Sequence, residues 1–149
     1  MRAVVYRVTW ARVLVQSQIL GEIGPGLLVL VGVAHDDGPA EAAWLAEKVA
    51  TLRVFEDADG KMNRSLAESG GGALVVSQFT LYGDARKGRR PSFVAAARPE
   101  HAEPLVSTVA ERLATAGVKT ATGRFGAQMT IESAGDGPVT ILLDSTRLF

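Results

Sequence analysis

A cluster of hydrogen-bonding side chains interrupts an otherwise apolar stretch in the middle of the chain. The stretch VSQFTLYGD covers residues 76–84 and places Ser77, Gln78 and Thr80 among valine, phenylalanine and leucine. A hydroxyl or amide group that is buried without a partner costs about 1–3 kcal/mol. These three side chains are therefore either paired inside the protein or exposed in a pocket, where a ligand or water pairs them.

A basic run follows this polar stretch directly. Arg86, Lys87, Arg89 and Arg90 place four cations within five residues. The whole chain has 16 basic and 16 acidic residues, and its formal net charge of zero provides no global field that would attract a polyanion. Taken alone, the run indicates a solvated, charged loop.

The residues present exclude several common kinds of active site. The two histidines, His35 and His101, cannot form a three-ligand metal centre unaided, and the chain has no cysteine. The sequence contains no HExxH, no G-x-S-x-G and no phosphate-binding P-loop. The glycines of residues 21–26 resemble a dinucleotide fingerprint, but they precede a predicted strand instead of a helix. We therefore expect no metal and no cofactor, and the lack of cysteine favours a reducing compartment.

The elements that must position these residues belong to one α+β domain over residues 1–149. Alternating apolar residues predict a strand over 2–16, and Asp36 to Pro39 predict the start of a helix. Mixed and antiparallel sheets then form a barrel-like core, with two or three helices packed on one side. Further strands are expected at 19–23, 27–34, 54–55, 73–81, 118–122, 128–133 and 139–143, and helices at 40–52, 92–97 and 99–117.

Length and composition agree with a single cytoplasmic domain. The 149 residues fall within the range of roughly 100–200 that is usual for one domain. The composition, 47% hydrophobic and 21% charged, is ordinary for a folded protein. The N-terminal residues MRAVVYRVTWARV lack the apolar core of a signal peptide, and no run reaches the roughly 18 apolar residues of a membrane span. We therefore expect a cytoplasmic protein without a membrane partner.

Motifs along the chain resemble those of the D-aminoacyl-tRNA deacylase family. The matching pieces are MRAVVYRV, GEIGPGLLVLVGV, LRVFEDADGKMN, VSQFTLYGDARKGRRPSF, TGRFGAQM and DGPVT. SQFTL and GPVT, with KGRRPSF between them, are the most specific. The chain departs from the family at Tyr6, where glutamine is usual, and at Gly135, where asparagine usually precedes Asp-Gly-Pro. The tail Ser145–Phe149 lies outside the resemblance.

The resemblance implies an enzyme that hydrolyses the ester between a D-amino acid, or wrongly attached glycine, and the terminal adenosine of tRNA. An aminoacyl ester is already activated and the neighbouring 2′-hydroxyl can assist, so a protein base is not obligatory. Gln78, Thr80 and Ser77 then become catalytic candidates that position the ester, with backbone N–H groups and the Gln78 and Thr80 side chains near the developing oxyanion. In the rival proposal Thr80 is a covalent nucleophile, although no activating base evidently lies beside it.

The resemblance also implies how such an enzyme rejects L-amino acids during chiral proofreading in translation. In the family, the bond between Gly137 and Pro138 is cis, and the pair reaches into the active site of the partner subunit of a homodimer. Its backbone carbonyls can bind the α-ammonium group while they occupy the volume that an L side chain would need. Glycine has no side chain, and it therefore also enters.

Two further groups of residues resemble binding segments of the family. Contacts to phosphates are independent of sequence, as an enzyme that accepts many tRNAs requires. For Met129, core packing is the alternative, and the cations can instead pair with acidic groups at the dimer interface. The pocket for the terminal adenosine is expected at Phe79, Phe125, Gly126, Ala127 and Met129, and contacts to acceptor-stem phosphates at Arg86, Lys87, Arg89 and Arg90.

Three other functions stay open on the sequence alone. A non-catalytic tRNA-binding module would share the basic run but has no need of the polar stretch together with Gly-Pro. A purely structural domain would respond to Thr80→Ala and Pro138→Ala in its stability alone. A hydrolase of free D-amino-acid esters or amides would work equally well without RNA.

Overall fold

One long strand organises the sheet. In the computed structural model, which describes residues 1–148, β1 (Arg2–Val15) pairs on one side with β2 (Gln18–Ile23) and β3 (Gly26–Gly32), and on the other side with β8 (Thr130–Asp144). Every second side chain of the first half of β1 is buried, as the alternating pattern predicts. β1 is therefore a central strand, flanked on both edges.

Three strands run parallel and end at the same edge of the sheet. β3 pairs in parallel with β6 (Gly72–Ser77), and β6 pairs in parallel with β7 (Lys119–Thr122). The strand order is β2-β1-β3-β6-β7, and the sheet curls until β2 lies beside β7. A methyl group added at Gly21 in β2 would lie 2.7 Å from the carbonyl oxygen of Thr122. This near closure of the sheet confirms the predicted barrel-like core.

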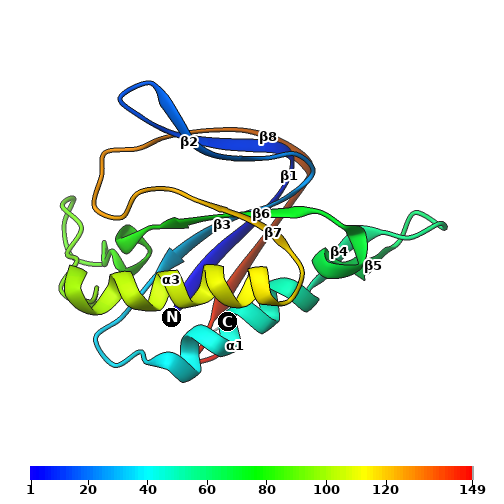
Figure 1. Ribbon diagram of the computed structural model, residues 1–149. Helices are drawn as coiled ribbons and strands as arrows, with labels where there is room; N and C mark the ends of the chain where they lie inside the picture. The colour runs from blue at the N-terminus through cyan, green and yellow to red at the C-terminus, as the bar shows by residue number, and fades with distance from the viewer. Residues whose placement is uncertain (149) are drawn as a thin grey trace.

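Two helices cover one face of the sheet (Figure 1). α1 (Pro39–Thr51) and α3 (Pro99–Thr115) pack against it, and both begin with proline at a position where its missing N–H is not needed. The helices bury Leu45 and Val109 among the strand residues of the larger core. A smaller core fills the inside of the curled sheet. No helix within residues 1–148 is long and apolar enough to cross a membrane.

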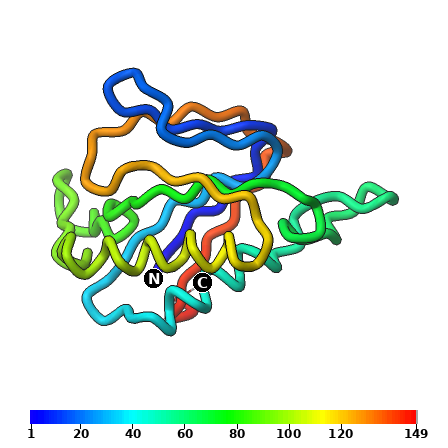
Figure 2. The backbone as a smooth tube through the Cα atoms, viewed as in Figure 1, coloured from blue at the N-terminus to red at the C-terminus, as the bar shows by residue number. Residues whose placement is uncertain are grey.

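A small hairpin projects from the body of the molecule, as the tube in Figure 2 shows. It consists of β4 (Arg53–Glu56) and β5 (Met62–Ser65), joined by the predicted DADGK turn. α2 (Leu66–Ser69) follows as a single helical turn that the sequence pattern did not predict. Its capping box explains it: Ser65 accepts from the backbone N–H of Glu68, and the Glu68 carboxylate accepts from the backbone N–H of Ser65.

Two predicted elements are wrong. The predicted strand 73–81 ends at Ser77, and the chain then enters a 3₁₀ turn at Phe79–Tyr82. The predicted helix 92–97 is instead a loop, because its backbone groups bond elsewhere: Ser92 bridges Asp84, and the N–H of Ala97 donates to Val33. An alanine-rich run favours a helix locally, but these bonds to neighbouring segments determine its conformation.

The last two predicted strands are one bulged strand. In the pairing of β1 with β8, Tyr6 lies opposite Thr140 and Val8 lies opposite Gly135. The single residue Arg7 therefore faces the four residues 136–139. This bulge pushes the Asp-Gly-Pro-Val segment out of the sheet.

The two ends of the described chain lie close together (Figure 1). The amino group of Met1 donates to the side chains of Asp37 and Ser145, and the backbone N–H of Ser145 donates to the Met1 carbonyl at 2.9 Å. Ser145 is thus tied into the fold although it lies outside the family resemblance. Phe149, the last residue of that tail, lies outside the described residues.

Candidate functional site

A cavity of about 680 Å³ lies at the edge of the sheet where the parallel strands end. Its walls are the ends of β3 and β6, the 3₁₀ turn, the loop before α3, the first half of α3 and the segment 125–131. Ligands of open α/β sheets bind beyond the carboxyl ends of parallel strands in the same way. The volume falls within the range of roughly 300–1,000 Å³ that is typical of small-molecule sites.

The cavity gathers most of the residues predicted from the sequence. Thr80 lies beside the lining, joined to it through Gln78. The predicted residues that line the cavity are Ser77, Gln78, Phe79, Phe125, Gly126, Ala127 and Met129. Gly137, Pro138, Arg86, Lys87, Arg89 and Arg90 do not line this described cavity.

The polar turn, residues 77–82, contributes Ser77, Gln78 and Phe79 to the lining of this cavity, and Thr80 lies next to Gln78. The backbone N–H of Gln78 donates to Val31 at 2.7 Å as the last bond between β3 and β6, and the chain then turns, with the N–H of Leu81 donating to Gln78 at 3.3 Å and the N–H of Gly83 donating to Thr80 at 2.9 Å. The Gln78 amide donates to the Thr80 hydroxyl. An amide is not a base in either orientation, so this contact orients the hydroxyl without activating it as a nucleophile.

A partly buried network around Arg2 supports the end of the polar turn. The Arg2 guanidinium lies 4.5 Å from the ring centroid of Tyr82, donates to Asp144 at 2.8 Å and donates to the Leu81 carbonyl at 3.2 Å. Burial, together with the nearby charge of Asp37, raises the pKa of the Tyr82 hydroxyl, which therefore stays protonated. Burial alone would raise the pKa of Asp144, but hydrogen bonds from Thr146 and Arg2 outweigh it and lower the pKa. These contacts keep Asp144 charged and hold the end of the turn in place.

The segment that follows β7 forms the opposite wall. Gly126 has a positive φ of 73°, and the N–H of Ala127 donates to Arg124 at 3.2 Å, so this segment turns back towards the cavity. A methyl group at Gly123 would lie 2.6 Å from the sulfur of Met129. Met129 lines the cavity and also packs against the smaller core, and its contact with adenosine stays a prediction.

The bulge of β8 is held by a buried arginine. Arg7 donates to the Val54 carbonyl at 2.6 Å, and its Nε lies 2.9 Å from Asp136, an ion-pair distance without the alignment of a hydrogen bond. A methyl group at Gly137 would lie 3.3 Å from Nη2 of Arg7. The bond between Gly137 and Pro138 is cis. The bulge thus presents Gly137 and Pro138 on a backbone that Arg7 fixes.

Comparisons with known proteins identify the family. The family model described as D-Tyr-tRNA(Tyr) deacylase matches residues 4–144. The chain belongs to this family. Relatives named D-aminoacyl-tRNA deacylase are 59% identical over 149 residues in Symbiobacterium thermophilum, covering 100% of this chain and 99% of the relative, and 55% identical over 147 residues in Thermus aquaticus, covering 99% and 97%. The predicted family membership is confirmed.

Solved structures show that this deacylase-family chain has a known fold. One described as "c-Myc DNA Unwinding Element Binding Protein" is 39% identical, with a TM-score of 0.90 over 97% of this chain and 99% of the other. A second, from a structural analysis of a probable eukaryotic D-amino acid tRNA deacylase, has a TM-score of 0.84 at 17% identity, over 95% and 97%, and shows the fold alone. The predicted fold class is therefore confirmed as well.

The cavity also has wall residues that the sequence analysis did not assign. They come from the loop before α3 and from α3 itself. Phe93 has a signal in the sequence, since it ends the KGRRPSF motif, but the apolar helix residues look like ordinary core positions. Among residues 1–148, no group of three or more His, Asp or Glu side chains is arranged to hold a metal ion. The unassigned wall residues from this loop and helix are Phe93, Ala96, Ala97, Pro99, Ala102 and Val106.

Proposed function

We propose that this protein hydrolyses the ester bond of D-aminoacyl-tRNA, releases the free D-amino acid and tRNA, and so proofreads chirality in translation. Membership of the deacylase family supports this activity and makes the protein an ester hydrolase. The observation that carries the proposal in the structure is the polar turn at the mouth of a nucleoside-sized cavity. We place the activity in the cytoplasm, where aminoacyl-tRNA is made and used.

The chemistry that fits this site is assisted by the RNA itself. Water adds to the ester carbonyl, the carbonyl oxygen gains negative charge, and the 3′-oxygen leaves with a proton. The neighbouring 2′-hydroxyl can relay that proton, because the site offers a hydroxyl and an amide but no base. Gln78, Thr80 and backbone N–H groups of the polar turn stabilise the developing oxyanion, and Ser77 contributes to positioning the ester.

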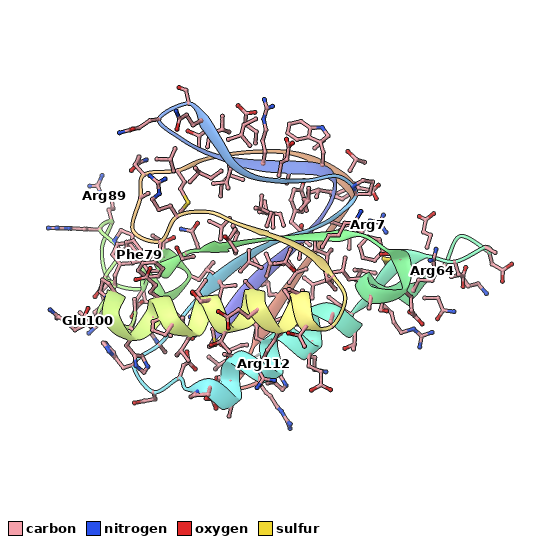
Figure 3. The ribbon with its side chains drawn as sticks, viewed as in Figure 1. Arg7, Arg64, Phe79, Arg89, Glu100 and Arg112 are labelled. Carbon is pink, nitrogen blue, oxygen red and sulfur yellow. The ribbon has the colours of Figure 1, made fainter. Side chains whose placement is uncertain are left out.

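Selection against L-amino acids requires a second copy of the chain in our proposal. Gly137 and Pro138 lie on the bulge and do not line the chain's own cavity. In Figure 3 the bulge partner Arg7 and the cavity residue Phe79 are labelled at opposite ends of the sheet. In a homodimer the bulge of one subunit can enter the cavity of the other and exclude an L side chain, whereas glycine still fits.

The basic loop, residues 84–92, is our proposed contact for the acceptor stem. Arg86 binds Asp84 through two hydrogen bonds at 2.9 and 2.6 Å, and these bonds lower the pKa of Asp84, so the pair stays charged. Within residues 1–148, no ion pair engages the side chains of Lys87, Arg89 or Arg90. Asp84 already compensates the charge of Arg86, so the other three cations are expected to contribute more to binding of the acceptor stem.

Replacing Arg89 by alanine is expected to weaken tRNA binding more than replacing Arg86. Each cation that releases a counterion contributes about one unit to the slope of log affinity against log salt. We expect Arg89→Ala to reduce that slope by about one unit, and Arg86→Ala to change it less. Binding of one tRNA at several salt concentrations measures both slopes. An equal reduction of the slope in both variants would contradict the inference that Asp84 already compensates the charge of Arg86.

The activity is tested with matched substrates that differ in chirality or in the terminal ribose. Hydrolysis of D-aminoacyl-tRNA, with L-aminoacyl-tRNA left intact, is expected for the purified protein. A D-aminoacyl-tRNA whose terminal adenosine lacks the 2′-hydroxyl should resist hydrolysis. Rapid cleavage of that deoxy substrate would overturn the RNA-assisted mechanism, and hydrolysis of simple D-amino-acid esters at the same rate would remove the role of RNA altogether.

The alternative function is a non-catalytic tRNA-binding module. The free cations of the basic loop are compatible with it, and one related structure carries the name of a DNA-element-binding protein. A binding module would retain tRNA affinity while it leaves both D- and L-aminoacyl-tRNA intact. The same hydrolysis experiment therefore separates the two functions.

A further inference from the structure

We propose that the ring of Phe93, which lies edge-to-face with the adenosine-pocket candidate Phe79, is a stacking platform for the base of the penultimate nucleotide, the cytidine that precedes the terminal adenosine of the substrate tRNA. This inference rests on the proposed function, and it extends the substrate site by one nucleotide beyond the cavity.

The two rings form an exposed aromatic pair at the mouth of the cavity. Phe79 is 57% exposed and Phe93 is 38% exposed. Their centroids lie 5.1 Å apart at an interplanar angle of 71°, an edge-to-face arrangement that leaves ring surface free. Among the large hydrophobic side chains that are exposed in residues 1–148, these two line the cavity; those that do not are Trp10, Ile19, Met62, Val94, Leu142 and Leu148.

Phe93 is held in place from both sides along the chain. Ser92 forms a two-way backbone bridge with Asp84, with N–O distances of 2.8 and 2.9 Å. On the other side, Ala96 bridges Ala34, and Nε2 of His35 lies 2.8 Å from the carbonyl oxygen of Val94. The backbone on both sides of Phe93 is therefore fixed before a ligand arrives, which reduces the entropy cost of binding.

Charge next to the platform suits an RNA strand and not an apolar protein surface. Lys87, Arg89 and Arg90 belong to the loop whose stem ends at Ser92, directly before Phe93. Figure 3 labels Arg89 and Phe79 at the same end of the molecule. Aromatic rings combined with adjacent cations are the usual composition of sites for single-stranded nucleic acids.

The path of the substrate leads over this platform. The terminal nucleoside occupies the cavity, whose inner walls are strands and a helix. The preceding nucleotide must leave through the mouth, where the aromatic pair and the cations lie. Stacking accepts any base, so the platform provides affinity for the common single-stranded end of every tRNA.

Three small substrates separate a base contact from a phosphate contact. They are the D-tyrosyl esters of adenosine, of adenosine 5′-phosphate and of the dinucleotide cytidylyl-adenosine. The decisive quantity is the ratio of kcat/KM for the dinucleotide ester to kcat/KM for the 5′-phosphate ester. For the unaltered protein we expect a ratio of about 10, within the range that base–aromatic stacking provides.

Variants of Phe93 and of its neighbour test which side chain produces this ratio. Phe93→Ala is expected to lower the ratio to near one, and Phe93→Trp to preserve it because an aromatic face is retained. Val94→Ala serves as the matched control in the same loop and should leave the ratio unchanged. The platform would be contradicted by a ratio near one in the unaltered protein. It would also be contradicted if the ratio stayed at about 10 in Phe93→Ala.

Failure of the platform is distinguishable from failure of the proposed function. If D-tyrosyl-tRNA is hydrolysed while the ratio is one, only the platform is wrong. If neither D-tyrosyl-tRNA nor any of the three esters is hydrolysed, the proposed deacylase function is wrong, and the proposed platform is then wrong as well.

Discussion

Replacing Thr80 by valine is expected to lower kcat for D-aminoacyl-tRNA by about 100- to 1,000-fold, the usual effect of removing one donor from an oxyanion site. The structure gives the reason: the Thr80 hydroxyl lies beside the Gln78 amide, which orients it but cannot remove its proton. Valine keeps the shape of threonine and removes the hydroxyl. The residual activity should still depend on the 2′-hydroxyl of the terminal ribose, as single-turnover hydrolysis of the ribo and deoxy substrates can measure.

A nucleophilic Thr80 would give a different set of results. Thr80→Ser would retain activity, Thr80→Val would abolish it, and a rapid acid quench would trap the amino acid on the enzyme as an ester. We expect no trapped ester with the unaltered protein. The unfolding midpoint of each variant provides the control, because an exposed residue such as Thr80 should change it little.

The periodic spacing of apolar residues correctly predicted those strands and helices that bury one regular face in the core. β1, α1 and α3 have regular apolar patterns, and their observed bounds agree with the predicted ones within about two residues, the usual uncertainty of helix and strand ends. The strand predicted over 73–81 is wrong from Gln78 onwards. Apolar and polar residues continue to alternate there, but the backbone leaves the extended conformation and forms a 3₁₀ turn. After the last ladder bond, from Gln78 to Val31, the backbone turns through bonds from Leu81 to Gln78 and from Gly83 to Thr80, and the alternation of side chains does not reveal this turn.

The sequence predicted those parts of the candidate site that belong to recognisable motifs. The polar turn and the segment around Phe125 were assigned from motifs, and the structure brings both to one cavity. The wall formed by α3 was missed, because residues such as Ala102 and Val106 differ in no local property from core residues. Their role arises from the packing of α3 across the ends of the parallel strands, which is a property of the fold.

Two departures from the family pattern prove to be in contact. A methyl group added at Gly135 would lie 1.9 Å from the hydroxyl oxygen of Tyr6, so the Tyr6 side chain occupies the space that a side chain at 135 would need. The sequence does not reveal this contact. Tyr6 is paired with Thr140 in the β1–β8 register, and only the bulge brings Gly135 next to the Tyr6 side chain. The glycine therefore accommodates the tyrosine.

Replacing Arg7 by alanine is expected to cost about 1–3 kcal/mol of unfolding free energy, because the buried Val54 carbonyl loses its donor, whereas the remaining Asp136 is partly exposed and is not left as a buried charge. Arg7 is 6% exposed, and its loss leaves the Val54 carbonyl without its donor and a void beside Gly137. Under the proposed dimer mechanism, the loosened bulge should also lower the preference for D- over L-aminoacyl-tRNA. Urea unfolding and the ratio of kcat/KM for the two substrates measure the two effects.

Arg12 provides the matched control on the same strand. Like Arg7 it pairs across β1 and β8, with Nε 2.6 Å from Glu132, but both side chains are about 40% exposed, at 39% and 40%. An exposed pair of this kind contributes about 0–1 kcal/mol, so Arg12→Ala should change stability little and leave the D-over-L ratio unchanged. Arg7→Lys retains the charge without the two-pronged geometry and should fall between the two alanine variants. If Arg7→Ala and Arg12→Ala behaved alike, the contacts of Arg7 would contribute no more than an exposed ion pair, and the bulge would not depend on them.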